Sequence, residues 1–431
     1  MYLTSNTPMH SRGNKKEIFK DIVIILTLFI FVRIVVFLLF DFSDLLTGDS
    51  GYYAEVGNNI VNNFSHGEYS SLSNSIDPTV FRPPLYSAFV GIMTLVVDSP
   101  LSVYIYQSVV YFIFAIACYI VLRNEDKKIA FLSVLLIAAS PSDALYNGRI
   151  LSENIVTPLL VMSSIFFIFP KNKTRYFLSG ILIGATILVR DVYILLPLLF
   201  IIVGLLNGVT SKALFPYVLG FLLVVSPWIV RNINLDENSG AFVSKGIMWS
   251  NIWSGSWIED HNDVIGKNNI PKKALDTLHV AISEGEFYEI WANRANNENF
   301  FKDASVHYIL NNPIKTVSTW VSRYHLLWIG TRSDLFVTSA ERYSLEWYFI
   351  KYFLYILNVV VLFFSVVGIF LAIKDRSKLI LLVIPIIYSA LIYIPFYNIE
   401  TRYTQPIYPI ILIYMTYVLL YLKKLLTKEQ V

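Results

Sequence analysis

The sequence predicts an all-α polytopic membrane protein with about ten transmembrane helices, external interfacial helices in the first loop, and a small external, mainly helical region. Three observations lead to this fold class. Hydrophobic residues make up 55% of the 431 positions and charged residues 15%, and apolar runs recur along most of the chain. The mean hydropathy is +0.57. This composition is typical of integral membrane proteins.

The first expected span covers residues 22–40 and follows Arg12, Lys15 and Lys16. It is long enough to cross a bilayer, at roughly 20 residues, and no small-residue cleavage site follows it. We therefore interpret it as a retained span and not as a signal peptide. The further expected spans cover residues 101–122, 129–146, 150–169, 176–189, 192–206, 213–230, 347–373, 379–396 and 406–422.

The apolar stretch after Pro83 and Pro84 is too short for a confident span, at about fifteen residues. Counting it as a span would also place Arg123, Lys127 and Lys128 on the outside. We expect this stretch to lie at the outer membrane interface, as a lateral helix or a re-entrant element.

Lysine and arginine gather in alternate loops, which orients the spans. The basic loops lie at residues 12–20, 123–128, 171–175, 212, 374–378 and 423–428. Loops rich in these residues stay in the cytoplasm, so both termini are expected there and the two long polar segments on the external face. The Asn- and Lys-rich loops suggest a bacterial source, which makes the bacterial cytoplasmic (inner) membrane the expected location.

This topology divides the chain into three parts. Residues 1–230 form an N-terminal transmembrane module whose first external loop, 41–100, is expected to be catalytic. Residues 231–346 form an external region, and residues 347–431 form the C-terminal transmembrane helices.

Five arginines lie on the face opposite to the basic loops, against the usual topology. They are Arg82, Arg149, Arg190, Arg231 and Arg402. Because topology does not explain basic residues on that face, we expect an anionic ligand there. For Arg82, the alternative is a side chain that only reaches toward lipid head groups.

Two acids stand near these arginines in the predicted topology. Asp49, in the segment GDSGYY, follows the first span and can either cap a short surface helix or face a lipid-borne substrate. Tyr53 and Glu55 follow on the same helix and are candidate substrate contacts. Glu153 begins an apolar run, where it can also simply favour the positive end of a helix dipole.

Two further features had open interpretations. Glu400 and Arg402 are two residues apart and can form a surface ion pair of small energetic value. Trp249, Trp253 and Trp257 share one face of a helix, either as a stacking surface for a sugar or as an interfacial anchor or small core.

Six sequence blocks follow one another in the order found in a known class of enzymes. The blocks are GDSGYY, FRPPLY, SENIVTPLL, LVRD, PWIVRN and ETRYTQPIYP. Together they resemble the GT-C glycosyltransferases, in particular bacterial relatives of the protein O-mannosyltransferases and of the lipid A aminoarabinose transferases. This resemblance implies transfer of a sugar from a polyprenyl-phosphate carrier to an acceptor on the external face, with inversion at the anomeric carbon.

The resemblance also implies roles for individual residues. Asp49 matches the acid that engages the acceptor, and Glu153 matches a second catalytic acid. The resemblance implies that three arginines bind the donor phosphate: Arg82, Arg190 and Arg402. The remaining candidates for substrate binding lie in or beside family motifs and are Arg149, Arg231 and Tyr403. One departure is that Ser50 follows Asp49 where the relatives often carry another acid.

The acceptor is left open between a cell-envelope glycan, a lipid and a protein. A glycan polymerase or ligase that uses a polyprenyl-diphosphate-linked oligosaccharide is the first alternative function. A transporter is the second, but transporters place ionisable residues near the bilayer midplane, and here most charges lie at helix ends.

The expected partners are the lipid-linked donor, the acceptor and membrane lipid. The net charge of +3 is small, so no nucleic acid is expected. No metal ligands are assigned, because no cluster of histidines or aspartates completes a site. A divalent ion between two carboxylates stays open as a cofactor.

Overall fold

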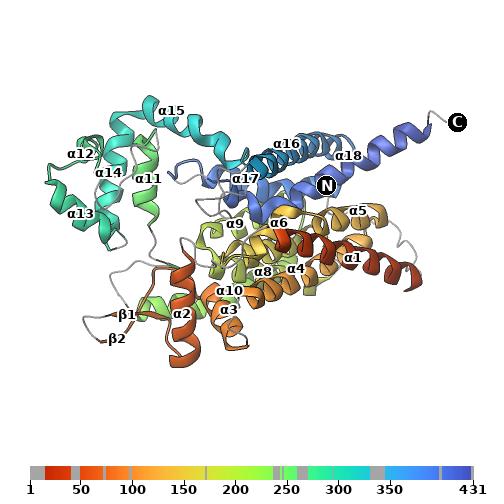
Figure 1. Cartoon of the computed structure of the whole chain (residues 1–431), viewed down its shortest axis with the longest axis horizontal. Coiled ribbons are helices and arrows are strands. Elements are labelled where there is room, and N and C mark those ends of the chain that lie inside the picture. The colour runs from red at the N-terminus through yellow and green to blue at the C-terminus, as the bar shows by residue number, and fades with distance from the viewer. Residues whose placement is uncertain are drawn as a thin grey trace.

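The computed structural model describes most of the chain as helices, packed around one large apolar core and smaller separate clusters (Figure 1). The described residues are 15–39, 49–70, 74–96, 100–169, 172–235, 243–244, 247–259, 270–294, 296–330, 345–397 and 400–428. The predicted helical, polytopic membrane architecture is confirmed. The one addition within these ranges is an antiparallel hairpin of β1 (Gly67–Ser70) and β2 (Ser75–Pro78), which the sequence analysis did not foresee.

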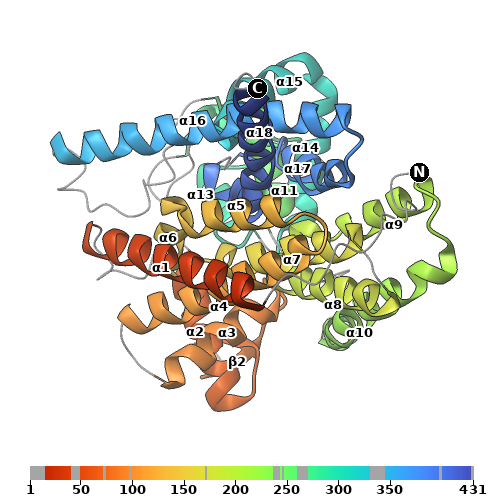
Figure 2. The same ribbon diagram turned by 90° about the vertical axis from the view of Figure 1, so that its right-hand side faces the viewer.

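The N-terminal part runs from the first helix to the end of α10. Its helices are α1 (Lys15–Leu39), α2 (Ser50–Asn63), α3 (Pro84–Val96), α4 (Pro100–Arg123), α5 (Lys127–Ala138), α6 (Pro141–Asn147), α7 (Glu153–Ile168), α8 (Lys173–Val189), the 3-10 helix η1 (Asp191–Tyr193), α9 (Leu196–Leu206) and α10 (Ser211–Leu235). Figure 2 shows α4 to α7 between α8 to α10 on one side and α16 to α18 on another.

The C-terminal part begins with a group of short helices and ends with long apolar ones. These are α11 (Met248–Trp257), α12 (Lys272–Asp276), α13 (Glu284–Ala292), α14 (Glu298–Asn311), α15 (Pro313–Tyr324), η3 (His325–Leu327), α16 (Leu345–Lys374), η6 (Lys378–Leu382), α17 (Val383–Ile392), η7 (Thr401–Ile407) and α18 (Tyr408–Lys428). In Figure 1, α11 to α14 lie at the same end of the molecule as α2 and the hairpin, opposite to the end of α18.

Among the described residues, five helices are long and apolar enough to cross a membrane, or six if one bent pair is a single span. The five are Lys15–Leu39, Ser102–Arg123, Ser211–Leu235, Tyr348–Lys374 and Thr401–Thr427. Several other expected spans coincide with shorter apolar helices, such as Glu153–Ile168. The count of ten spans therefore stays a prediction. The short apolar stretch after Pro83 is the 13-residue helix α3, and its placement at the outer interface, lateral or re-entrant, stays a prediction.

The expected span over residues 129–146 coincides with two helices, which are long and apolar enough for a membrane span only when taken together. The chain bends by 52° between α5 and α6. Pro141 has no N–H to donate and disfavours helical geometry in the residue before it, so Ser140 is extended. The Ser140 hydroxyl then accepts from the Asp143 N–H and caps the new helix.

Helices α11 to α15, in the region predicted to be external, have an aromatic core of their own. Trp253 and Trp257 are fully buried and pack with Phe287 and Phe301. Trp249 is partly buried against the same cluster. The tryptophan series is therefore a small core, as one of the two interpretations held, and its buried rings are not a stacking surface for a sugar.

The first external loop is shaped by a close contact between α2 and α3. A Cβ at Gly57 on α2 would lie 2.5 Å from the Ser87 carbonyl oxygen on α3, and a Cβ at Gly91 would meet the Gly57 carbonyl oxygen. Only glycine lets the two backbones approach this closely. The contact fixes α2, and with it the residues at its N-terminal end, relative to the segment before α3.

We predict that Gly57→Val pushes α2 away from α3. Forcing a branched side chain into this contact should cost about 1–3 kcal/mol of stability. Thermal unfolding of the detergent-solubilised protein should show a lower Tm. Gly285→Ala on α13 is the control, because a Cβ there has no neighbour within 4 Å. An unchanged Tm for Gly57→Val would mean that the two helices can separate without cost.

Candidate active site

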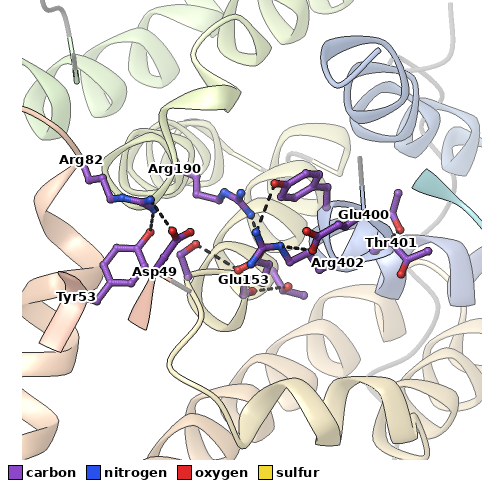
Figure 3. A network of polar contacts seen from close by, with 12 residues as sticks. Asp49, Tyr53, Arg82, Glu153, Arg190, Glu400, Thr401 and Arg402 are labelled. Carbon is purple, nitrogen blue, oxygen red and sulfur yellow. Dashed lines mark hydrogen bonds and ion pairs between the residues drawn. The ribbon is translucent and has the colours of Figure 1, made fainter. Parts of the chain in front are cut away.

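Three ion pairs between a carboxylate and an arginine form one cluster beside α2, α7 and η7 (Figure 3). Asp49 Oδ1 lies 2.8 Å from Arg82 Nη2, and Glu153 Oε1 lies 2.6 Å from Arg190 Nη1. Glu400 Oε2 lies 2.9 Å from Arg402 Nε. The structure thus brings together both predicted catalytic acids and all three arginines predicted to bind the donor phosphate.

Asp49 occupies the N-cap position of α2 but makes no capping hydrogen bond with its side chain. The next residue, Ser50, is buried and donates its hydroxyl proton to the Ile150 carbonyl oxygen, at 2.8 Å. This bond ties the start of α2 to the turn before α7. The Asp49 carboxylate is then directed at Arg82 instead of at the helix backbone.

Arg82 precedes the two prolines that lead into α3 and sits among aromatic rings. Its Nη1 donates to the Tyr53 hydroxyl at 3.0 Å, and its guanidinium carbon lies 5.3 Å from the centre of the Tyr53 ring. Phe81 lies at a similar distance, 5.1 Å. The site therefore holds this guanidinium by a carboxylate, a hydroxyl and two rings, which fixes its position.

The charges of Asp49 and Arg82 stabilise each other. Burial alone raises the pKa of Asp49, but the Arg82 guanidinium, helped by Arg402 and Arg190, lowers it by more, so the pKa lies below its ordinary value. Burial lowers the pKa of Arg82, but Tyr53 and Asp49 raise it by more. Both groups are therefore ionised at neutral pH.

Glu153 is the first residue of α7 and is buried. Its second oxygen accepts from the Ser152 hydroxyl at 3.3 Å, while the first pairs with Arg190. Arg190 follows α8 in an extended conformation, which turns its side chain back toward the start of α7. The helix-dipole interpretation fits the position of Glu153, but the carboxylate is also held by a specific cation.

Tyr403 links the second and third ion pairs. The guanidinium carbons of Arg190 and Arg402 lie 5.1 Å and 5.2 Å from the centre of its ring. Its ring also stacks on Tyr393, with centroids 4.7 Å apart. Burial raises the pKa of Glu400 above its ordinary value, and the nearby charges of Glu153 and Asp49 add to this in spite of Arg402. Glu400 was not among the predicted site residues.

Three other predicted residues lie outside this cluster. Arg231 donates to the carbonyl oxygens of Thr79 and His66, at 2.8 Å and 3.0 Å, and so anchors the chain on both sides of the hairpin. Glu55 accepts from the Tyr69 N–H at 2.9 Å and holds β1 against α2. Arg149 is buried in the turn before α7, where its carbonyl oxygen accepts from Gln107.

Within the described ranges, no group of three or more histidine, cysteine, aspartate or glutamate side chains is arranged to hold a metal ion. The three site carboxylates are each paired with a guanidinium. The divalent ion that the sequence analysis left open as a cofactor is untested, and a transfer assay with and without EDTA can decide it.

Comparison with known proteins now adds two findings. Residues 81–230 match the model of a family described as dolichyl-phosphate-mannose-protein mannosyltransferase. The crystal structure of the apo oligosaccharyltransferase from Archaeoglobus fulgidus superposes with a TM-score of 0.52 at 15% identity, over 95% of this chain and 51% of that one. The chain has the GT-C fold. It spans about half the length of that archaeal enzyme, and the resemblance to GT-C glycosyltransferases is confirmed.

Two further solved structures are similar to this GT-C chain at lower TM-scores. ArnT from Cupriavidus metallidurans bound to undecaprenyl phosphate gives a TM-score of 0.42 at 14% identity, over 91% of this chain and 77% of that one. The A. fulgidus oligosaccharyltransferase with zinc and sulfate gives 0.48 at 15% identity, over 93% and 49%. A search of curated proteins gave no match.

We predict that Glu153→Gln destabilises the fold, because it leaves the Arg190 charge without its buried partner. Breaking a buried ion pair from one side costs about 3 kcal/mol or more. Thermal unfolding should show a large fall in Tm. The double variant Glu153→Gln with Arg190→Gln removes both charges and should recover part of the loss. Equal Tm values for the wild type and Glu153→Gln would contradict the buried pair.

Proposed function

We propose that this protein is a glycosyltransferase of the inner membrane that moves a sugar from a polyprenyl-phosphate-linked donor to a cell-envelope acceptor, with inversion. The observation that carries the proposal is the ion pair between Asp49 and Arg82, next to two more arginines. It joins an ionised carboxylate and fixed cations in one external cluster, as sugar transfer from a phosphate requires.

The arginines supply the chemistry on the phosphate side. Breaking the bond between the sugar and the phosphate leaves negative charge on the departing lipid phosphate. Guanidinium groups bind phosphate through paired N–H groups and stay charged throughout the reaction. Arg82 and Arg402 are proposed to stabilise the developing charge, and their fixed positions over aromatic rings mean that little reorganisation is needed.

Asp49 supplies the chemistry on the acceptor side. Its carboxylate accepts the proton of an acceptor hydroxyl or amine while that group attacks the anomeric carbon opposite to the phosphate. The new glycosidic bond forms as the old bond breaks, and the electron pair of the old bond leaves with the lipid phosphate. Glu153 is proposed to hold Arg190 in place.

The proposed orientation puts this cluster on the external face and both termini in the cytoplasm. The first external loop, 41–100, then carries the catalytic base within the module 1–230. In Figure 1 the end of α18 lies away from α2 and the hairpin, which supports a site on the face opposite to the lysine-rich end of α18. The acceptor, whether glycan, lipid or protein, would approach from the side of residues 231–346.

A transfer assay tests this function directly. We predict that Asp49→Asn and Arg82→Ala each reduce transfer of labelled sugar from a polyprenyl-phosphate donor to membrane acceptors by about 10²-fold or more, because each removes one side of the reaction. Glu289→Gln on the exposed face of α13 is the charge-matched control and should keep full activity. Full activity in both site variants, at matched expression, would refute the proposal.

The pH dependence of the reaction tests Asp49 as the base. Because its pKa lies below the ordinary value, the active carboxylate is present above that pKa and is lost only as the pH falls through it. The acid limb of kcat/KM is therefore expected below the pH range in which an ordinary aspartate carboxyl titrates. In Arg82→Gln, burial is opposed only by the more distant charges of Arg402 and Arg190, so the acid limb of the residual activity should move to higher pH. A wild-type limb near pH 6 would point to a different base.

A further inference from the structure

The carboxylates paired with the three site arginines differ in how easily each can turn away from its guanidinium. The Glu153 side chain is 3% exposed and is bound by both Arg190 and Ser152. The Asp49 and Glu400 side chains are 38% and 44% exposed. Glu153 cannot turn away without stranding a buried charge, whereas the other two carboxylates can turn toward solvent.

Arg402 is held in place independently of Glu400. Its side chain is mostly buried, its guanidinium lies over the ring of Tyr403, and its Nη2 is 3.5 Å from the Tyr403 hydroxyl. In the part of the chain that the structure describes, Arg402 is the ion-pair partner of Glu400, through Nε alone. If Glu400 turns away, the guanidinium therefore remains directed into the cluster.

The surroundings of Glu400 weaken its hold on Arg402. Burial disfavours its charged form, and the charges of Glu153 and Asp49 repel it, so its pKa lies above the ordinary value although Arg402 and Arg190 lower it. The Glu400 carboxylate is partly exposed and lies near two other negative charges. It is the ion pair of the cluster that a stronger anion can replace most easily.

Glu400 holds Arg402 by charge, with Oε2 2.9 Å from Nε, so a phosphate that binds this guanidinium meets the negative charge of the carboxylate and competes with it for the same cation. Resting on the function proposed above, the geometry points to Glu400 as an internal competitor of the lipid phosphate. Glu400 pairs with Arg402 while the site is free of lipid phosphate. When the donor binds, its phosphate displaces Glu400 from Arg402, and the ion pair forms again as the spent carrier leaves.

This role makes Glu400 a positioning residue that acts through Arg402, and no covalent bond to it is made or broken. Its effect falls on both the donor and the spent carrier, because both present a phosphate to the same guanidinium. A competitor that lowers the affinity for the spent polyprenyl phosphate also speeds its release. Glu400 therefore raises the turnover rate and lowers the affinity for the donor.

The test is binding of undecaprenyl phosphate, without a sugar, to the purified full chain in detergent by isothermal titration calorimetry. We predict that Glu400→Gln lowers the Kd about fivefold, the factor expected for loss of one partly exposed ion pair. In steady-state transfer it should lower the KM for the donor and also lower kcat, because release of the carrier slows. Glu289→Gln, with the same change of charge on α13, should leave the Kd unchanged.

A second variant separates competition from a general loss of negative charge. Arg402→Gln should weaken binding, with the remaining affinity supplied by Arg82. In that background, adding Glu400→Gln should give no further tightening, because the contact through which Glu400 acts is gone. A gain that persists in the double variant would overturn the proposal.

The outcomes also distinguish this proposal from the function on which it rests. If Glu400→Gln leaves the Kd unchanged or raises it while Arg402→Gln weakens binding, Glu400 is no competitor and the donor site stands. If neither Arg402→Gln nor Arg82→Ala changes the Kd, both proposals fail. Thermal unfolding of each variant checks that the chain is folded.

Discussion

The site depends on the cost of placing charge among tightly packed helices. A buried arginine without a partner costs several kcal/mol, so each site guanidinium must meet a carboxylate. The partners of Arg82 and Arg190 come from positions 33 and 37 residues earlier in the chain. Folding therefore has to bring the starts of α2 and α7 to these arginines, and the same constraint that stabilises the fold assembles the cluster.

Helix packing then decides which groups face the cluster. The glycine contact between α2 and α3, and the bond from Ser50 to the turn before α7, hold Asp49 beside Arg82. Arg231 and Glu55 act further away, where they fasten the hairpin region to α10 and α2. The charged residues predicted on the external face thus fall into two groups. Some form the cluster of ion pairs, and others hold the surrounding segments in place.

Hydropathy predicted the helical membrane fold because burial in lipid or in a core depends on composition over long windows. It missed the bend before Pro141, because an average over twenty residues hides one absent N–H donor.

Hydropathy also could not predict the binding partner of each arginine. Arg82 and Arg231 were both predicted on the external side, but one binds a carboxylate and the other binds backbone carbonyl oxygens. Glu400 was ambiguous for the same reason, since the burial around it comes from distant segments.

The geometry distinguishes Asp49 from Glu153, which the sequence analysis could only name together as catalytic candidates. A general base must come within about 3 Å of the proton that it accepts, so it needs a carboxylate oxygen within reach of the acceptor. Both oxygens of Glu153 have partners, and its side chain is buried. Asp49 contacts Arg82 through Oδ1 and is partly exposed. An acceptor can therefore approach Asp49 without breaking the ion pair, whereas reaching Glu153 would first require Arg190 to move. This difference, and not the order of the motifs, is the physical reason why Asp49 and not Glu153 is the proposed base.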